Sequence, residues 1–216
     1  MPTSNKIKTI TKYFNKLFPN PKCELHYQTD WQLLVATMLS AQCTDRQVNL
    51  VTPKLFERYS SISDFAKAEP AKLETLIYST GFYRNKTKNI IMAAKLLMKE
   101  YHGILPKNMI ELLKLPGVAR KTANVLLGEF YHIQEGIAVD THVKRISGHL
   151  QLSKEQRPEK IEKDLMQIFP KVTWTKISHQ IILFGRKICS AKRPNCQICE
   201  LKKFCQYYQN KKVIME

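Results

Sequence analysis

The fold is decided by one stretch of sequence, Leu115-Pro116-Gly117-Val118-Ala119-Arg120-Lys121-Thr122-Ala123, which lies between two helical patterns. Pro116 ends the first helix, and Gly117 permits the tight turn that follows. The small side chain of Ala123 lets the two helices approach closely. The stretch therefore predicts a helix-hairpin-helix, which we place at about residues 109–130.

The turn of this hairpin is a candidate phosphate-binding site. The backbone N–H groups that open a helix have no partner within it, and they lie at the positive end of the helix dipole. Gly117, Ala119 and Arg120 are the candidate contact residues. Contacts of this kind hold a sugar-phosphate backbone and do not read bases.

Lys121 lies in the first turn of the second helix and is a candidate nucleophile. The helix dipole and the neighbouring Arg120 disfavour its charged form, which is the direction that an amine nucleophile needs. Position alone favours a simpler interpretation, in which Lys121 is one more phosphate-binding lysine.

Asp140 ends the short apolar run Ile137-Ala138-Val139 and begins another helical pattern, so its default role is a helix N-cap. A carboxylate in this position stays ionised. Negative charge also stabilises the oxocarbenium-like state of a sugar whose N-glycosidic bond is breaking. Asp140 is therefore a candidate catalytic residue as well as a cap.

Helical periodicity extends over almost the whole chain, and no long alternating strand pattern competes with it. The expected helix starts include Asp30 as a cap, Ser61 with Asp64, Pro70 as a first helical residue, and Asn108 with Glu111. We expect an all-α protein of about ten short helices, with any domain boundary inside compact structure.

Four of the six cysteines form a group with the spacing Cys189-x6-Cys196-x2-Cys199-x5-Cys205. Disulfides are not expected in a reducing compartment, and a chain of 216 residues buries a sufficient core without them, so the group indicates a metal centre. A zinc ribbon usually has two C-x2-C pairs and this segment has one. The spacing therefore favours an iron-sulfur cluster and leaves zinc as the alternative.

Lys192 and Arg193 lie in the loop between the first two of these cysteines, where they would be directed outward toward phosphates. The isolated Cys23 and Cys43 are expected to be small core residues.

Lys and Arg number 35 and Asp and Glu 18, so the net charge is 35 − 18 = +17. Such an excess indicates a polyanionic partner, nucleic acid before membrane. Bases gather in residues 1–22, 84–107 and 186–212, and these stretches could form one surface. The acids at Glu155, Glu159, Glu162 and Asp164 are expected to face away from the polyanion.

The longest apolar runs fall short of the ~20 residues that cross a bilayer, and residues 1–12 lack the apolar core of a signal peptide. We therefore expect an intracellular protein. A core of this size needs no partner, so a monomer is the default expectation.

Several motifs together make a specific resemblance: Leu39-Ser40-Ala41-Gln42, Gly81-Phe82-Tyr83, the hairpin, Val139-Asp140-Thr141-His142 and the four cysteines. Through essentially the whole chain the sequence resembles the endonuclease III family. Its members are bifunctional DNA glycosylases with a [4Fe-4S] cluster. They remove oxidised or otherwise damaged pyrimidines from double-stranded DNA, and they cut the abasic strand by β-elimination.

The resemblance implies two helical domains. The first is a six-helix bundle at residues 23–134 with the hairpin. The second joins residues 1–22 to 135–216 and has the cluster loop at 189–205. Lys121 as the Schiff-base lysine and Asp140 as the catalytic aspartate would then face each other across the cleft between them. It also implies a bacterial, nucleoid-associated cytoplasmic protein whose partner is double-stranded DNA with damaged pyrimidines or abasic sites.

The same resemblance assigns the four grouped cysteines to the [4Fe-4S] cluster. It implies that Gln42 fills the gap left by a flipped nucleotide and that Phe82 is the wedge beside the orphan base. Without the resemblance, Phe82 would be assigned to the core.

Two residues depart from the family pattern. Phe82 stands where leucine is common, and Ala119 where the hairpin commonly has a second glycine. If that second position needs a positive φ, alanine adds about 1 kcal/mol of strain. Two alternatives stay open, an adenine mismatch glycosylase and a non-enzymatic iron-sulfur module that binds DNA.

Overall fold

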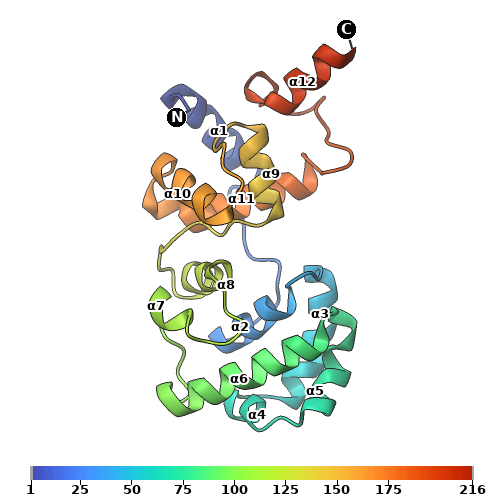
Figure 1. Cartoon of the computed structure of the whole chain (residues 1–216). Helices are drawn as coiled ribbons and strands as arrows, with labels where there is room; N and C mark the ends of the chain where they lie inside the picture. Colours follow the sequence, from blue (N-terminus) through green and yellow to red (C-terminus); the bar gives the residue numbers. More distant parts are fainter. Residues whose placement is uncertain (1, 216) are drawn as a thin grey trace. The chain divides into compact units, whose positions relative to one another are not determined.

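The computed structural model describes residues 2–215, and the described chain consists of helices and connecting turns, as Figure 1 shows. The predicted all-α class is confirmed. Twelve α-helices occur between residues 2 and 215, together with four short 3₁₀- or π-helical segments, so the number is slightly higher than the expected ten. None of the helices formed by these residues is long and apolar enough to span a membrane.

The chain divides into two compact units, each with its own apolar core. We call Cys23–Glu135 the hairpin unit, because it contains the predicted helix-hairpin-helix. Met1–Lys22 and Gly136–Glu216 together form the second unit, which we call the cysteine unit.

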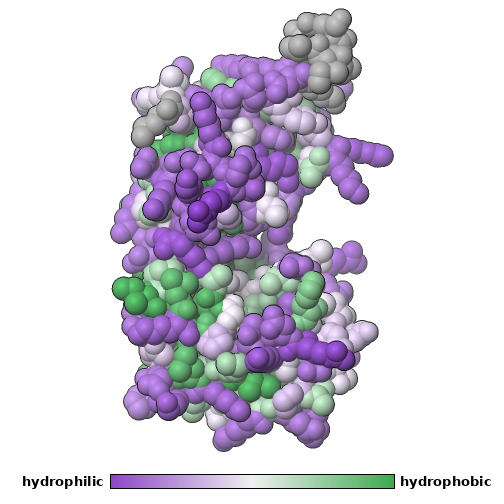
Figure 2. All heavy atoms as spheres, viewed as in Figure 1, coloured by the Kyte–Doolittle hydropathy of each residue, from purple (hydrophilic) through white to green (hydrophobic). Residues whose placement is uncertain are grey.

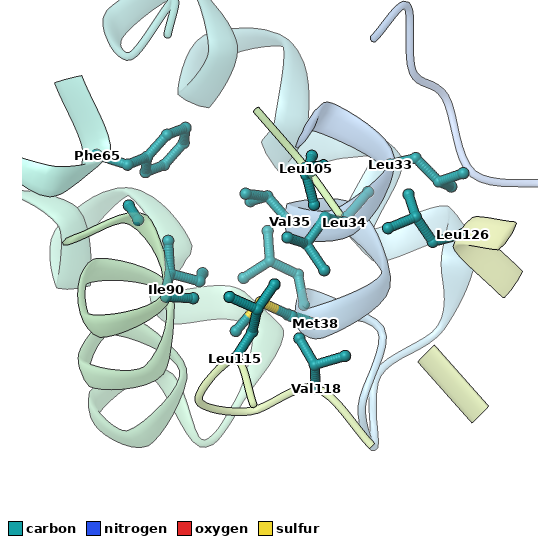
Figure 3. Close-up of a cluster of buried hydrophobic side chains, with 14 of the residues drawn as sticks. Leu33, Leu34, Val35, Met38, Phe65, Ile90, Leu105, Leu115, Val118 and Leu126 are labelled. Atoms are coloured by element: carbon teal, nitrogen blue, oxygen red, sulfur yellow. The ribbon is translucent and has the colours of Figure 1, made fainter. Parts of the chain in front are cut away.

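The hairpin unit is built around α2 (Asp30–Leu39), in which every residue from Leu33 to Leu39 is buried. Figure 3 shows part of this core, with side chains from α2, α4, α6 and the hairpin turn. The other elements are α3 (Asp45–Arg58), α4 (Ile62–Ala66), α5 (Pro70–Ile77), η1 (Tyr78–Thr80), α6 (Tyr83–Tyr101), α7 (Met109–Leu112), α8 (Arg120–Val125) and η2 (Leu126–Phe130).

The cysteine unit packs the first helix of the chain against its C-terminal half. The rings of Phe14 and Phe184, both fully buried, have centroids 5.2 Å apart and join α1 to α11. Its elements are α1 (Ser4–Leu17), α9 (Thr141–His149), α10 (Pro158–Ile168), η3 (Lys171–Thr173), α11 (Trp174–Lys187), η4 (Lys202–Phe204) and α12 (Gln206–Met215).

Most of the predicted helix starts are confirmed. The side chains of Ser61 and Asn108 accept hydrogen bonds from the third residue on, and Pro70 is the first residue of α5. The prediction for Asp30 is wrong by one residue. Thr29 is the N-cap of α2 and accepts a hydrogen bond from the Gln32 N–H, while Asp30 is already helical.

The four acids that are expected to face away from the polyanion do not share one environment. Glu162 is only 4% exposed, because it lies on the buried face of α10. Asp164 accepts a hydrogen bond from the Ser153 hydroxyl at 2.5 Å, and Glu155 pairs with Lys160 at 3.6 Å. These acids therefore serve local structure in the cysteine unit.

Hydrophilic side chains dominate the face drawn in Figure 2, as expected for a chain in which 25% of residues are charged. Cys23 and Cys43 differ from the expectation of core residues, since both are only partly buried at the margin of the hairpin unit's core.

Candidate functional site

The turn of the hairpin accepts only glycine at position 117. Gly117 has a φ of +79°, and a Cβ there would lie 2.8 Å from both the Cβ of Asn89 and the Cε of Met38. The Val118 N–H donates to the Leu115 carbonyl at 3.0 Å and closes the turn. The turn is thus pressed against α2 and α6, and Figure 3 shows Leu115 and Val118 beside Met38.

Ala119 is not strained, because the condition for strain, a positive φ at this position, is not met. It is the N-cap of α8 with φ −93° and ψ 168°, which is extended backbone that any residue adopts. The turn places its left-handed residue at Gly117, two positions earlier. The side chain of Ala119 has no oxygen with which to cap the helix, so it leaves room for an external acceptor at the start of α8.

Lys121 occupies the first turn of α8 and its side chain is exposed, whereas Arg120 is half-buried. After Val125 the helix continues as the π-helical segment Leu126–Phe130. Such segments are rare and often mark functional sites, and no feature of the sequence predicted this one. The hairpin therefore presents an accessible primary amine on α8, a helix that packs into the core of the hairpin unit through Ala123.

Gln42 and Phe82 both have left-handed backbones, with φ of +54° and +48°. Phe82 is 65% exposed, so the assignment to the core, made without the resemblance, is wrong. Gln42 is exposed as well. A bulky residue with positive φ is uncommon, and exposed strained residues of this kind occur at functional sites.

Lys86 is a site residue that the sequence reasoning missed, because it was counted among the surface bases. It is only 6% exposed, and its Nζ donates to the carbonyls of Leu39 at 2.7 Å and Thr80 at 2.8 Å. Burial lowers the pKa of its ammonium group. Its spacing from the buried Ile90 and Leu97 was a usable signal, since all three fall on one face of α6.

Asp140 is the N-cap of α9, as predicted, and its Oδ1 accepts a hydrogen bond from the Val143 N–H at 2.8 Å. The residue is half-buried, at the end of the buried run from Ile137 to Val139. Burial lowers the pKa of the nearby His142, while the charge of Asp140 acts in the opposite direction. The cap uses one carboxylate oxygen, so a second role for this side chain is compatible with the first.

The four grouped cysteines line a single pocket together with mainly apolar and aromatic side chains. Desolvation raises the pKa of Cys189 to about 11 and also raises those of Cys199 and Cys205. No three His, Cys, Asp or Glu side chains of the described part of the chain are grouped closely enough to hold one metal ion. Four sulfur donors around one pocket, without a carboxylate, nevertheless fit a soft metal centre whose ligands are spread over several metal atoms.

Lys192 and Arg193 are exposed in the loop between Cys189 and Cys196, as predicted. The Ser190 hydroxyl accepts a hydrogen bond from the Arg193 N–H at 3.2 Å and donates to the Arg193 carbonyl at 2.7 Å. This local brace fixes the backbone that carries the two cations.

Comparison with known proteins first defines the class of protein. Residues 35–171 match the family model described as HhH-GPD superfamily base excision DNA repair protein. A solved structure of a trapped endonuclease III–DNA covalent intermediate matches with a TM-score of 0.94 and 40% identity, over 98% of this chain and 100% of that chain.

Curated relatives narrow the class. An endonuclease III of Synechocystis sp. is 51% identical over 196 residues, 91% of this chain and 90% of that protein. The endonuclease III of Bacillus subtilis is 41% identical, over 90% of this chain and 89% of its own. The chain therefore belongs to the endonuclease III family, and it is a DNA glycosylase and AP lyase of base excision repair. The mismatch-glycosylase and non-enzymatic alternatives are not favoured.

Proposed function

We propose that the protein removes oxidised or otherwise damaged pyrimidines from double-stranded DNA and then cuts the abasic strand on its 3′ side by β-elimination. The observation that carries the proposal is the accessible Lys121 in the first turn of a helix that opens directly from the hairpin. A glycosylase that only hydrolyses the base needs no amine there, whereas a lyase does. Because the curated relatives are bacterial, we infer that the protein acts on DNA in the bacterial cytoplasm, at the nucleoid. We also infer that it acts as a monomer.

In this proposal, binding begins with phosphate contacts that do not depend on sequence. The start of α8, with Gly117, Ala119 and Arg120, holds one phosphate group, and Lys192 and Arg193 hold another from their braced loop. Because neutralised phosphates release counterions, salt should weaken binding by roughly 0.9 log units per contact for each decade of concentration.

Extrusion of the damaged nucleotide is the next step, and a lesion that stacks or pairs poorly makes it easier. Gln42 enters the gap that the nucleotide leaves, and Phe82 stacks beside the orphan base. The exposure of both residues and their fixed, strained backbones support these roles.

The chemical steps use Lys121 and Asp140. The neutral amine of Lys121 attacks C1′ of the sugar as the damaged base leaves with its bonding electrons and takes up a proton. Asp140 assists by accepting a proton from the amine or by stabilising the positive charge that develops on the sugar. The C1′–O4′ bond then breaks, O4′ takes up a proton, and the amine nitrogen forms an iminium with C1′. The iminium loses a proton from C2′, the 3′ phosphate leaves with the C3′–O electrons, and water releases Lys121.

Cys189, Cys196, Cys199 and Cys205 would hold a [4Fe-4S] cluster. When bound, it supplies structural cross-linking of the C-terminal segment, and no step above requires electron transfer from it. The pocket that the four thiols share supports this assignment. A brown protein with iron and sulfide in equal amounts is expected, while a colourless protein with zinc would overturn the assignment.

Borohydride trapping tests the lysine directly. Wild type should become covalently attached to a duplex that contains thymine glycol, and Lys121→Gln should give no adduct. Lys114→Gln is the matched control, because Lys114 is an exposed lysine of the same hairpin that pairs with Glu111. If Lys121→Gln still traps, Lys121 is not the Schiff-base residue. If wild type neither traps nor excises thymine glycol, the proposed substrate class is wrong.

A further inference from the structure

The buried ammonium group of Lys86 links the C-terminal ends of two helical segments that are far apart in sequence. Its Nζ donates to the carbonyl of Leu39, the last residue of α2, and to that of Thr80, the last residue of η1. Carbonyls at helix C-termini lack partners within the helix and lie at its negative end, so a cation stabilises both.

Each of these carbonyls lies just before one of the two candidate gap residues, Gln42 and Phe82, whose backbones are both left-handed. Gln42 follows Leu39 by three residues, and Phe82 follows Thr80 by two. A left-handed backbone at a non-glycine residue persists only where the surrounding structure enforces it. Further hydrogen bonds fix the same segments: the Ser40 hydroxyl donates to the Thr37 carbonyl, and the Thr80 hydroxyl donates to the Ile77 carbonyl.

Core packing alone does not explain a lysine at position 86. The residue lies on the apolar face of α6, where a methionine of similar length would avoid the desolvation of a cation. Removal of the ammonium group would leave both carbonyls without this donor. A buried ionic group of this kind favours one arrangement of the chain over other compact arrangements.

We propose that Lys86 is a positioning residue that fixes the Gln42 and Phe82 segments at the mutual spacing that a DNA gap requires. The gap is the one left in the duplex by an extruded nucleotide, so this inference rests on the proposed function. Lys86 contacts neither DNA nor the reacting atoms. It acts through the two carbonyls, and it matters for extrusion more than for the chemistry that follows.

The test compares one substrate that requires extrusion of a stacked base with one that has no base. Lys86→Met removes the ammonium group and keeps the apolar stem, while Lys54→Met removes the same charge from an exposed position on α3, outside the basic stretches. Single-turnover excision of thymine glycol paired with adenine should fall about tenfold or more in Lys86→Met relative to Lys54→Met. Borohydride trapping on a preformed abasic duplex, measured on the same preparations, should stay within about twofold.

A third substrate, the same lesion opposite a mismatched base, gives a readout that a role in folding alone would not change. When thymine glycol is placed opposite a mismatched base, extrusion becomes easier, and the defect of Lys86→Met should shrink by several fold. Equal losses on the lesion and abasic substrates, or a defect that is the same in paired and mismatched duplexes, would overturn the inference. So would wild-type rates in Lys86→Met.

If Lys86→Met does not fold, Lys86→Gln replaces it in the test, because the glutamine amide still has N–H donors on a shorter, uncharged side chain. The same comparison of the three substrates then tests the inference. Failure of the proposed function is distinguishable from failure of this inference, because it would be visible in wild type as absence of thymine glycol excision, whatever the variants do.

Discussion

The two units of this protein are stabilised by different means. The hairpin unit is closed by apolar burial, with seven consecutive buried residues from Leu33 to Leu39 at its centre. In the cysteine unit the helices also share a core, but the stretch from Ile188 to Leu201 contains no helix. There the four cysteines line one pocket, so with the proposed cluster this segment would depend on its ligand, whereas the hairpin unit would not.

A few contacts anchor the cysteine segment. Leu201 is fully buried, whereas the residues between Cys189 and Cys199 are half-buried or exposed. Arg145 of α9 donates to the carbonyls of Gly185 and Cys189 and so fixes the start of the segment. Further along, two residues of α1 reach it: the Tyr13 hydroxyl donates to the Ile198 carbonyl at 3.2 Å, and Lys16 pairs with Glu200 at 2.7 Å.

Cys199→Ser should have the largest effect, and it should be confined to the cysteine unit. In the proposed cluster site, loss of one sulfur ligand would remove the cross-link of the segment, because metal binding and folding are coupled in such sites. Amide hydrogen exchange in residues 189–205 should accelerate on the order of a hundredfold or more. Exchange in α2 and α6 should stay at its wild-type rate.

Cys23→Ser is the matched control, because Cys23 is a cysteine of the hairpin unit outside the group of four. It should leave exchange in residues 189–205 unchanged. If Cys199→Ser also accelerates exchange throughout α2, the two units are not independent and the contrast between them is wrong.

The sequence predicted the features that depend on local chemistry. The hairpin turn, the caps at Ser61 and Asn108, the cap role of Asp140 and the grouped cysteines all follow from residue type and spacing. These signals work because a turn, a cap or a ligand loop is specified by a few neighbouring residues.

The features that residue patterns did not settle depend on backbone dihedral angles or on contacts between distant segments. The helical spacing of Lys86 indicated a buried position, but it did not indicate the partners of the ammonium group. The exposure of Phe82 results from the left-handed turn between η1 and α6, and the burial of Lys86 depends on carbonyls 47 and 6 residues away. The absence of strain at Ala119 required the actual dihedral angles, because the sequence does not say which hairpin position has positive φ. Tertiary context decided each of these cases.

Gly117→Ala should have the next largest effect, and it should be confined to the hairpin unit. The new Cβ would combine left-handed strain with overlap against Asn89 and Met38, for a total of about 3 kcal/mol in free energy of unfolding. Urea denaturation followed by a probe in each unit measures the loss and shows which unit carries it.

Gly81→Ala separates the two causes. Gly81 also has a positive φ, of +71°, but a Cβ there would meet nothing within 4 Å. It should therefore cost only the backbone strain, about 2 kcal/mol, because a φ of +71° with a ψ of 159° is a conformation that almost only glycine adopts. Equal losses in the two variants would show that packing against α2 and α6 does not determine the residue at position 117.

Asp140→Ala should destabilise the cysteine unit by about 1 kcal/mol, because the Val143 N–H loses its cap. Asp140→Asn keeps an oxygen acceptor and should cost only a few tenths of a kcal/mol. Both variants lack the carboxylate charge, so both should excise thymine glycol far more slowly, by about a hundredfold or more. Excision by Asp140→Asn at the wild-type rate would leave the residue with its cap role alone.

Gly148→Ala should have the smallest effect, and its sign is opposite. Gly148 lies in α9, its backbone is not left-handed, and a Cβ there would meet nothing within 4 Å. Alanine loses less backbone entropy than glycine when a helix forms, so the cysteine unit should gain about 0.5 kcal/mol. Thermal unfolding should shift upward by about 1–2 °C.

Gly185→Ala tests whether the gain in Gly148→Ala depends on the open space around the new Cβ. Gly185 is also a helical glycine of the cysteine unit, but its Cβ would lie 3.0 Å from the Cβ and Nδ1 of His142 and 3.2 Å from Arg145. That crowding should outweigh the gain in helix propensity, and it should disturb the arginine that fixes the start of the cysteine segment. If both variants stabilise the protein equally, the contacts of Arg145 are loose, and the cysteines together with the contacts from α1 hold residues 189–205 in place.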